Sequence, residues 1–196
     1  MAEMRRDEKR KFVRDAIYAA AIEIFTERGF DETTVEEIAQ AAGVSRRSFF
    51  RYFASKDDLL AQTAMSYGAA LRNAIDACPR QFSTLEVIEA TVHAGVEHAA
   101  APEARTREVV EIAIRSESAR QAYQSRTSSI EDSLASAFAA RTKKRSTAAA
   151  ESRMLAGVTL AVMNATIAAW FTGEHKNLPG AASRVLQLLI KTMNGD

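Results

Sequence analysis

The side chains best able to do chemistry lie between residues 46 and 56, and their chemistry is the binding of anions. Arg46, Arg47 and Arg51 are closely spaced, and Lys56 follows them. A guanidinium can bond two acceptors on a guanine edge or clamp a phosphate, and an ammonium can bind a phosphate as a point charge. This spacing therefore favours a surface that contacts nucleic acid.

If these residues form a helix, its two sides differ in character. At about 100° per residue, one side carries Phe49, Tyr52 and Phe53, and the other carries Arg46, Arg47, Phe50 and Arg51. The aromatic side is predicted to pack in a core, and the basic side to face the ligand. Because the N-terminal residues of a recognition helix reach base edges, Arg46, Arg47 and Ser48 are the predicted base contacts.

The flanking residues predict how this helix is positioned. Thr34 and Glu37 have the spacing of a capping box, and an apolar repeat of helical period follows Thr34. Gly43 is suited to the left-handed conformation that ends a helix, and Ser45 can cap the next one. Two short helices are therefore predicted to meet at a tight turn. A third begins at Lys56, where a cation beside free backbone amides would suit a DNA phosphate.

The segment from Thr33 to Leu60 resembles the N-terminal domain of the tetracycline-repressor (TetR) family. Residues 48–53 are SFFRYF and residues 55–60 are SKDDLL, both typical of that family. The resemblance implies an N-terminal helix-turn-helix that binds DNA. By position, the DNA contacts that it implies are Thr34, Arg46, Arg47, Ser48, Phe50, Tyr52 and Lys56.

One of these positions departs from the family pattern. Phe50 stands where the family most often has a tyrosine whose hydroxyl bonds a phosphate, and phenylalanine cannot form that bond. We expect Phe50 to contact DNA by packing against a sugar or a thymine methyl group. Thr34 and Lys56 are the expected phosphate anchors.

Composition favours an all-α protein. The chain has 196 residues, 47% of them hydrophobic, with three prolines and eight glycines, and no convincing alternating strand. A single cysteine, Cys78, excludes an intramolecular disulfide and is more simply explained by packing than by redox sensing. No apolar run approaches the roughly 18 residues that would indicate a membrane span, and the basic start of the chain lacks the apolar stretch of a signal peptide, so a cytoplasmic protein is expected.

The charge is unevenly distributed, although the net charge is only +1. Residues 1–14 carry six basic and three acidic side chains, residues 15–43 carry one basic and seven acidic, and residues 44–56 carry four basic and none acidic. Within residues 1–56, net positive charge is thus confined to the N-terminal arm and the predicted recognition helix. The arm is either a solvated terminus or a second contact to phosphates or the minor groove.

The predicted architecture is all-α with about nine helices. An N-terminal three-helix DNA-binding domain is placed at residues 1–54, and a C-terminal helical ligand-binding and dimerisation domain at residues 55–196. Helical spacing and breakers predict helices near residues 6–28, 34–42, 46–53, 56–78, 85–99, 102–115, 117–141, 148–172 and 182–193, with an exposed loop at 142–152. The resemblance implies that the last two helices pair with their copies in a second subunit, giving a twofold dimer suited to a palindromic operator.

The resemblance also implies a small-molecule pocket among the fourth to eighth helices. Aromatic, thioether and amide groups in those segments are the candidates: Tyr67, Phe82, Tyr123, Phe138, Met154, Met163, Asn164 and Trp170. Each of these residues is more simply explained as ordinary core than as a ligand contact. Because basic side chains are scarce in these segments, an apolar or weakly polar effector is expected.

Other chemistry has little support. Glu89, His93 and Glu97 recur every four residues, a spacing that could hold a metal, but they flank an apolar stripe and are better explained as a solvated face. No nucleophile motif, phosphate-binding glycine loop or zinc-type cysteine pair occurs. We therefore expect neither an enzyme nor a bound cofactor or metal.

The hypothesis from sequence is a ligand-responsive transcriptional regulator, a repressor that leaves its operator when a small molecule binds. Two alternatives stay open. One is a regulator that needs no ligand because its core is filled, and the other is a small-molecule sequestering protein whose DNA-binding surface has weakened, which Phe50 would suggest.

Overall fold

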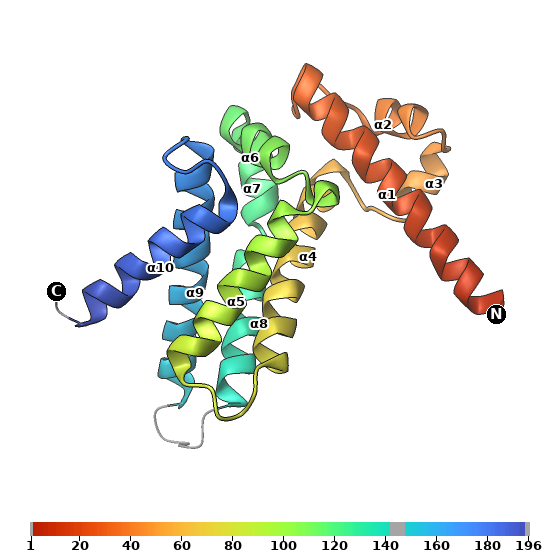
Figure 1. The fold of residues 1–196 in the computed structure, drawn as a ribbon. Coiled ribbons are helices and arrows are strands. Elements are labelled where there is room, and N and C mark those ends of the chain that lie inside the picture. The colour runs from red at the N-terminus through yellow and green to blue at the C-terminus, as the bar shows by residue number, and fades with distance from the viewer. Residues whose placement is uncertain (1, 142–147, 195–196) are drawn as a thin grey trace. The chain divides into compact units, whose positions relative to one another are not determined.

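The protein is helical throughout the part that the computed structural model describes, residues 2–141 and 148–194 (Figure 1). The helices are α1 (Ala2–Arg28), α2 (Val35–Ala41), α3 (Arg46–Phe50), α4 (Lys56–Ala77), α5 (Thr84–Ala100), the 3₁₀ helix η1 (Pro102–Ala104), α6 (Thr106–Arg115), α7 (Glu117–Gln124), α8 (Thr127–Ala139), α9 (Ala148–Phe171) and α10 (Leu178–Asn194). No strand occurs in these residues. The predicted all-α class is confirmed.

Packing divides the chain into two compact units. The first unit comprises Met1–Ala64 and Arg105–Ser125, and the second comprises Met65–Ala104 and Arg126–Asp196. The division predicted from sequence, at residue 54, differs from this one in two ways. The start of α4 packs with the first unit, and α6 and α7 belong to it although they lie far along the chain.

The core of the first unit holds the short helices in place. Apolar side chains of α1, α2, α3 and the start of α4 form a cluster that also includes Val109 and Ile112 of α6 and Ala119 and Ala122 of α7. The predicted helix ends are confirmed, because Gly29 has φ 93° after α1 and Gly43 has φ 66° after α2. These turns bring α2 and α3 against α1.

Polar contacts fasten α6 and α7 to the rest of the first unit. Arg105, which precedes α6 with φ 46°, donates from Nη1 to the Ala19 carbonyl of α1 at 3.1 Å. Ser116 caps α7 and donates its hydroxyl to Asp31 Oδ2 at 2.8 Å. This bond is the main reason that the pKa of Asp31 is lowered.

In the second unit, α5, α8, α9 and the later part of α4 run side by side, and α10 lies at an angle against α5 and α9 (Figure 1). Two glycines allow close approach. A Cβ on Gly95 would lie 2.6 Å from Leu71, and one on Gly68 would lie 2.7 Å from Ile130. The facing helices are therefore tightly packed at these two places.

Two predicted helices are interrupted. The helix expected over 117–141 is broken into α7 and α8, because Ser125 and Arg126 end one helix and begin the next. The hydroxyl of Ser125 donates to the Ala122 carbonyl at 2.7 Å, a local bond that competes with helix continuation. The helix expected from Pro102 begins instead as η1, and α6 starts only after Arg105.

The expectation that no segment could span a membrane was too strict. The α9 region Ala149–Phe171 is long and apolar enough by length and composition, with a mean hydropathy of 1.7. Small, uncharged Ala, Gly, Thr and Asn residues separate the large apolar residues of this segment. The segment was therefore not recognised as one apolar run. Helix α9 packs against α5, α8 and α10 on one side, and only 33% of its apolar segment is buried.

The predicted loop at 142–152 lies largely outside the described residues, since the structure describes none of 142–147. Helix α9 begins at Ala148, as predicted for the helix over 148–172, so the last residues of the predicted loop are helical.

Candidate nucleic-acid interface

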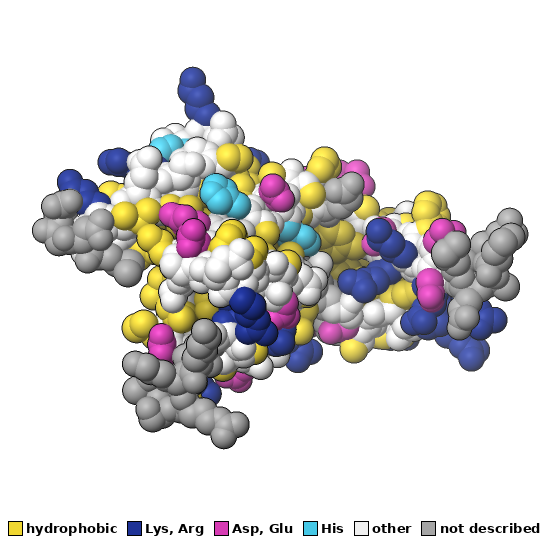
Figure 2. Space-filling model, turned by 60° about the horizontal axis from the view of Figure 1, so that its bottom comes forward, with side chains coloured by type: hydrophobic (Ala, Val, Ile, Leu, Met, Phe, Trp, Pro, Cys, Tyr) yellow, Lys and Arg dark blue, Asp and Glu magenta, His cyan; other side chains and the backbone are white. Residues whose placement is uncertain are grey.

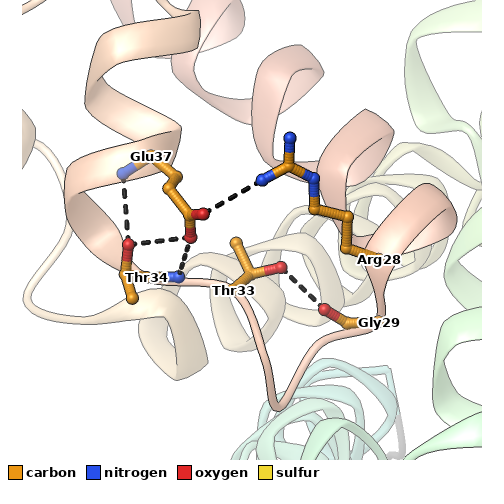
Figure 3. A network of polar contacts seen from close by, with 5 residues as sticks. All are labelled: Arg28, Gly29, Thr33, Thr34 and Glu37. Atoms are coloured by element: carbon orange, nitrogen blue, oxygen red, sulfur yellow. Dashed lines mark hydrogen bonds and ion pairs between the residues drawn. The ribbon is translucent and has the colours of Figure 1, made fainter.

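The first helix of the interface, α2, begins at the predicted capping box (Figure 3). The Glu37 amide donates to Thr34 Oγ1 at 3.3 Å, and the Thr34 amide donates to Glu37 Oε2 at 2.9 Å. The Thr34 hydroxyl also donates to that carboxylate at 2.8 Å. The hydroxyl expected to anchor a phosphate is thus committed to the cap, and the anchoring role of Thr34 stays a prediction.

Glu37 also joins α2 to the end of α1. Its Oε1 lies 3.0 Å from Arg28 Nη1, and Thr33, next to the cap, donates its hydroxyl to the Gly29 carbonyl at 2.6 Å (Figure 3). The pKa of Glu37 is lowered, chiefly by the Thr34 backbone bond, then by the Thr34 hydroxyl, with a smaller contribution from Arg28. The turn between α1 and α2 is therefore held at both ends.

Helix α3 ends at Phe50, earlier than the predicted 46–53, and together with the turn that follows it has the two predicted sides. Ser45 caps it by accepting from the Ser48 amide at 3.1 Å. Phe49 and Phe53 are buried, with ring centroids 5.7 Å apart, whereas Phe50 is 45% exposed. The buried rings fix the rotation of α3, so that its other side faces outward.

The outward side carries the predicted base contacts. Arg46 and Arg47 are exposed at the start of α3, and Ser48 is half-buried because its hydroxyl accepts from Ser45. The Arg46 guanidinium lies over the Phe50 ring, 5.3 Å from its centroid, and its Nε is 2.6 Å from Glu36 Oε1. Sequence inspection missed Glu36, since α2 and α3 meet only once folded.

Tyr52 has a mixed position. It is half-buried and packs against the core of the first unit, and the Arg51 guanidinium lies 5.2 Å from its ring centroid. Its carbonyl accepts from Gln62 Nε2 at 3.3 Å. Both predicted roles of Tyr52, holding α3 and contacting DNA, are compatible with this position.

Lys56 lies differently from the prediction. Its ammonium turns inward and donates to the carbonyls of Phe30, Asp31 and Thr33 at 2.6, 3.0 and 3.0 Å. It also lies 4.6 Å from the Phe30 ring centroid. All three N–H donors are thereby used within the protein, so the expected phosphate contact through the ammonium is not supported. Lys56 ties the start of α4 to the turn after α1.

The N-terminal part of α1 adds positive charge. It extends past α3 in Figure 1, and Figure 2 shows Lys and Arg side chains gathered where α1 begins. Residues 6–14 carry five exposed cations and two carboxylates: Arg6, Lys9, Arg10, Lys11 and Arg14 against Asp7 and Glu8. The outward side of α3 and this segment are two basic surfaces of the first unit.

Comparison with known proteins identifies this arrangement. The sequence model of the tetR family of bacterial regulatory proteins matches residues 17–63, and the model of the MftR C-terminal domain matches residues 82–194. The chain belongs to the TetR family. An N-terminal DNA-binding helix-turn-helix followed by a helical C-terminal domain is the architecture that this membership implies, as the sequence predicted.

Individual relatives match this TetR-family chain over shorter segments. The chain is 33% identical over 89 residues to the transcriptional regulator TcmR of Streptomyces glaucescens, covering 45% of this chain and 39% of TcmR. It is 54% identical over 37 residues to MftR of Mycobacterium tuberculosis, covering 19% of each. The chain thus spans well under half the length of these curated relatives.

Solved structures share the whole fold at low identity. NalD of Pseudomonas aeruginosa, a secondary repressor of a multidrug efflux pump, aligns with a TM-score of 0.65 at 19% identity, over 92% of this chain and 96% of NalD. FadR of Bacillus subtilis, solved with stearoyl-CoA, aligns with a TM-score of 0.60 at 19% identity, over 89% and 96%. These similarities support the TetR fold of the chain.

The eight residues predicted to line an effector pocket are divided between the two units. In the TetR-family chain, Phe82, Met154 and Asn164 are exposed, and Tyr123 packs against the core of the first unit. Burial there raises the pKa of Tyr123 to about 12, with a further contribution from Tyr18. None of these four residues lies in the interior of the second unit, because side-chain type alone does not show which way a helix faces, and their contact with an effector stays a prediction.

The other four lie in the second unit, with Phe138 and Met163 buried and Tyr67 and Trp170 half-buried. His98, not included from sequence, lies beside Tyr67 with ring centroids 6.1 Å apart. Burial lowers the pKa of His98, which favours the neutral imidazole. The sequence offered one indication that His98 is partly buried, because helical spacing places it on the same face as Val87 and Thr91.

The acidic and histidine stripe of α5 forms no metal centre. His93 and Glu97 are exposed and Glu89 is half-buried. Over the described ranges, 2–141 and 148–194, no group of three potential metal ligands comes together.

Proposed function

We propose that this TetR-family chain is a cytoplasmic, homodimeric transcriptional repressor that binds a palindromic operator and releases it when a small molecule binds. The observation that carries the proposal is the orientation of α3. Phe49 is fully buried while Arg46 and Arg47 are exposed, so the basic side is free to enter a major groove. The basic start of α1 would add phosphate contacts that do not depend on base sequence.

Dimer formation through α9 and α10 is supported by uncovered apolar surface. Met154 of α9 is 59% exposed and Leu188 of α10 is 47% exposed. Small side chains at Ala161, Ala165 and Ala168 are also exposed along α9. An apolar surface of this kind favours a partner, and a second copy of the same two helices would cover it symmetrically.

The effector is proposed to be apolar or weakly polar. Three buried hydroxyls in the second unit bond only their own helix, since Thr91, Thr159 and Thr166 donate to the carbonyls four residues earlier at 2.7, 2.8 and 2.8 Å. They therefore add little polarity to the interior. That FadR of Bacillus subtilis was solved with stearoyl-CoA supports the view that this fold can hold a long apolar acyl chain.

A regulator without an effector is the second candidate, and the packing of α5 favours it. Gly95 lies against Leu71 and Met163 so closely that an added Cβ would clash, which leaves little free space there. The third hypothesis is a sequestering protein with a weakened DNA-binding surface. The same experiment tests it and the proposed repressor function.

The direct experiment is binding of the purified full chain to duplexes from the region flanking its own gene. The proposal expects one duplex to compete at least about 1,000-fold better than bulk DNA at physiological salt. If no flanking duplex competes better than bulk DNA, the sequestering reading gains. Acyl thioesters and apolar substrates of the proteins encoded by adjacent genes are then added to the protein–DNA complex. Release of the DNA would indicate a repressor that responds to an effector, and no release would indicate a regulator that needs none.

A further inference from the structure

Arg46 is not a free cation on the surface of α3. Its Nε is 2.6 Å from Glu36 Oε1 on α2, and its guanidinium lies 5.3 Å from the centroid of the Phe50 ring. The Phe50 ring is itself supported from the side by buried Phe49, with centroids 5.5 Å apart at 84°. The guanidinium thus contacts a carboxylate at one edge and a ring on one face, while the Arg46 and Glu36 side chains remain 65% and 58% exposed.

This arrangement decides which donors remain. A guanidinium has five N–H donors, and the Glu36 carboxylate lies at its Nε edge, 2.6 Å away. The pair of terminal nitrogens, Nη1 and Nη2, stays available as a fork. A fork of this kind matches the O6 and N7 acceptors of guanine, and a guanidinium that is already oriented loses less side-chain freedom on binding.

The arrangement also decides what Arg46 does not favour. The Arg46–Glu36 pair carries no net charge, so it releases fewer counterions from DNA than a lone arginine would. A phosphate close to Arg46 would meet the Glu36 carboxylate as well. Base edges carry partial charges only, so they are repelled far less.

We propose that Glu36 is a specificity-determining residue of the DNA interface, because it positions Arg46 to contact guanine and discourages phosphate binding. The inference rests on the proposed contact of α3 with DNA. It also gives Phe50 a function that needs no hydroxyl, since the ring supports the guanidinium from one face. Phe50 then contributes to the DNA interface through its ring, although it lacks the hydroxyl of the family's usual tyrosine.

The test compares full-length wild type with Glu36→Gln, with Arg46→Ala, and with the double variant. Each protein is given a random duplex library, and the wild-type consensus and its single-base variants are then titrated across salt concentrations. Glu32→Gln is the matched control, because it removes an exposed carboxylate of the same unit four residues earlier in the chain.

Glu36→Gln is expected to bind all duplexes more tightly and to steepen the salt dependence by about 0.9 in log–log slope, as one more phosphate contact would. The preference for one base over the others should fall about fivefold or more at one position in each half-site. Glu32→Gln should keep that discrimination. Phe50→Leu, which keeps apolar volume but removes the ring, should lower it in the same way.

The double variant shows whether Glu36 acts through Arg46. In the Arg46→Ala background, Glu36→Gln should leave base preference unchanged, which a merely structural role would not predict. The inference is overturned if Glu36→Gln keeps wild-type discrimination and salt slope, or if it changes base preference equally without Arg46. A wild type that selects no sequence at all would instead overturn the proposed function, and this inference with it.

Discussion

At the scale of single residues, the position of Lys56 in the sequence did not predict the contacts of its side chain. Sequence placed a cation at the start of a helix, next to the DNA-binding segment, and favoured a phosphate contact. In the structure its ammonium bonds three carbonyls of the turn that follows α1. A four-carbon side chain can reach inward or outward, so position along the chain could not decide between them.

Lys56→Met is therefore expected to lower the stability of the first unit without changing the electrostatics of DNA binding. Loss of hydrogen bonds from a charged donor should reduce the free energy of unfolding by about 1–3 kcal/mol. Urea unfolding measures this, with Lys176→Met, at an exposed position of the second unit, as control. A flattened salt dependence of DNA binding, with stability unchanged, would restore the phosphate-anchor role.

Other residues were predictable because their own chemistry settles their conformation. Gly29 and Gly43 have positive φ where helices were expected to end, and Ser45 and Thr34 cap the helices that follow. The burial of Phe49 against the exposure of Phe50 follows from helical periodicity. The Glu36–Arg46 pair did not follow, because it joins two helices whose packing no local pattern specifies.

At the scale of elements, two capping boxes begin helices of different units. Thr34 with Glu37 caps α2, and Ser83 with Glu86 caps α5. The second pair has the same spacing in the sequence and could have been recognised. Hydrogen bonds to Thr34 and to Ser83 lower the pKa of the two glutamates below their ordinary value of 4.5.

These caps predict a loss of stability in acid. A carboxylate whose pKa is lower in the folded state contributes stability that is present above pH 4.5 and is lost as the pH falls through its folded pKa. Glu37→Gln should therefore unfold with a smaller change in urea midpoint between about pH 6 and about pH 3 than wild type does. Glu27→Gln, at an exposed position of α1, is the control. Equal acid sensitivity of wild type and Glu37→Gln would contradict the cap's contribution.

Elements also show where prediction from sequence stops. Helix lengths came close, because apolar spacing and breakers are local signals. The break between α7 and α8 was missed, since it contains neither proline nor glycine and depends on serine hydroxyls such as Ser125. The packing of α6 and α7 in the first unit was also missed, because it depends on distant partners such as Asp31 and Ala19.

At the scale of the whole molecule, the proposed binding to a palindromic operator requires two subunits. Leu188→Glu places a charge on the uncovered apolar surface of α10, where burial against a partner would be costly. Sedimentation should show monomers in place of dimers, and affinity for a palindromic duplex should fall about 100-fold or more as bivalent binding is lost. Ile114→Glu is the control, since Ile114 is 63% exposed on α6, outside the proposed interface. A Leu188→Glu protein that remains dimeric would exclude that part of α10 from the interface.

The central claim is that α3 contacts bases through exposed arginines in a twofold dimer. Selection of bound duplexes from a random library by the full chain tests it most directly, with Arg47→Ala and Arg47→Lys beside wild type. Wild type should enrich a palindrome with half-sites about one helical turn apart, and Arg47→Ala should lose about 1–3 kcal/mol of binding and relax one base position in each half-site. Arg47→Lys should keep the salt dependence but lose the base preference, because lysine lacks the fork. Enrichment of no sequence by wild type, or an unchanged preference in Arg47→Ala, would contradict the account.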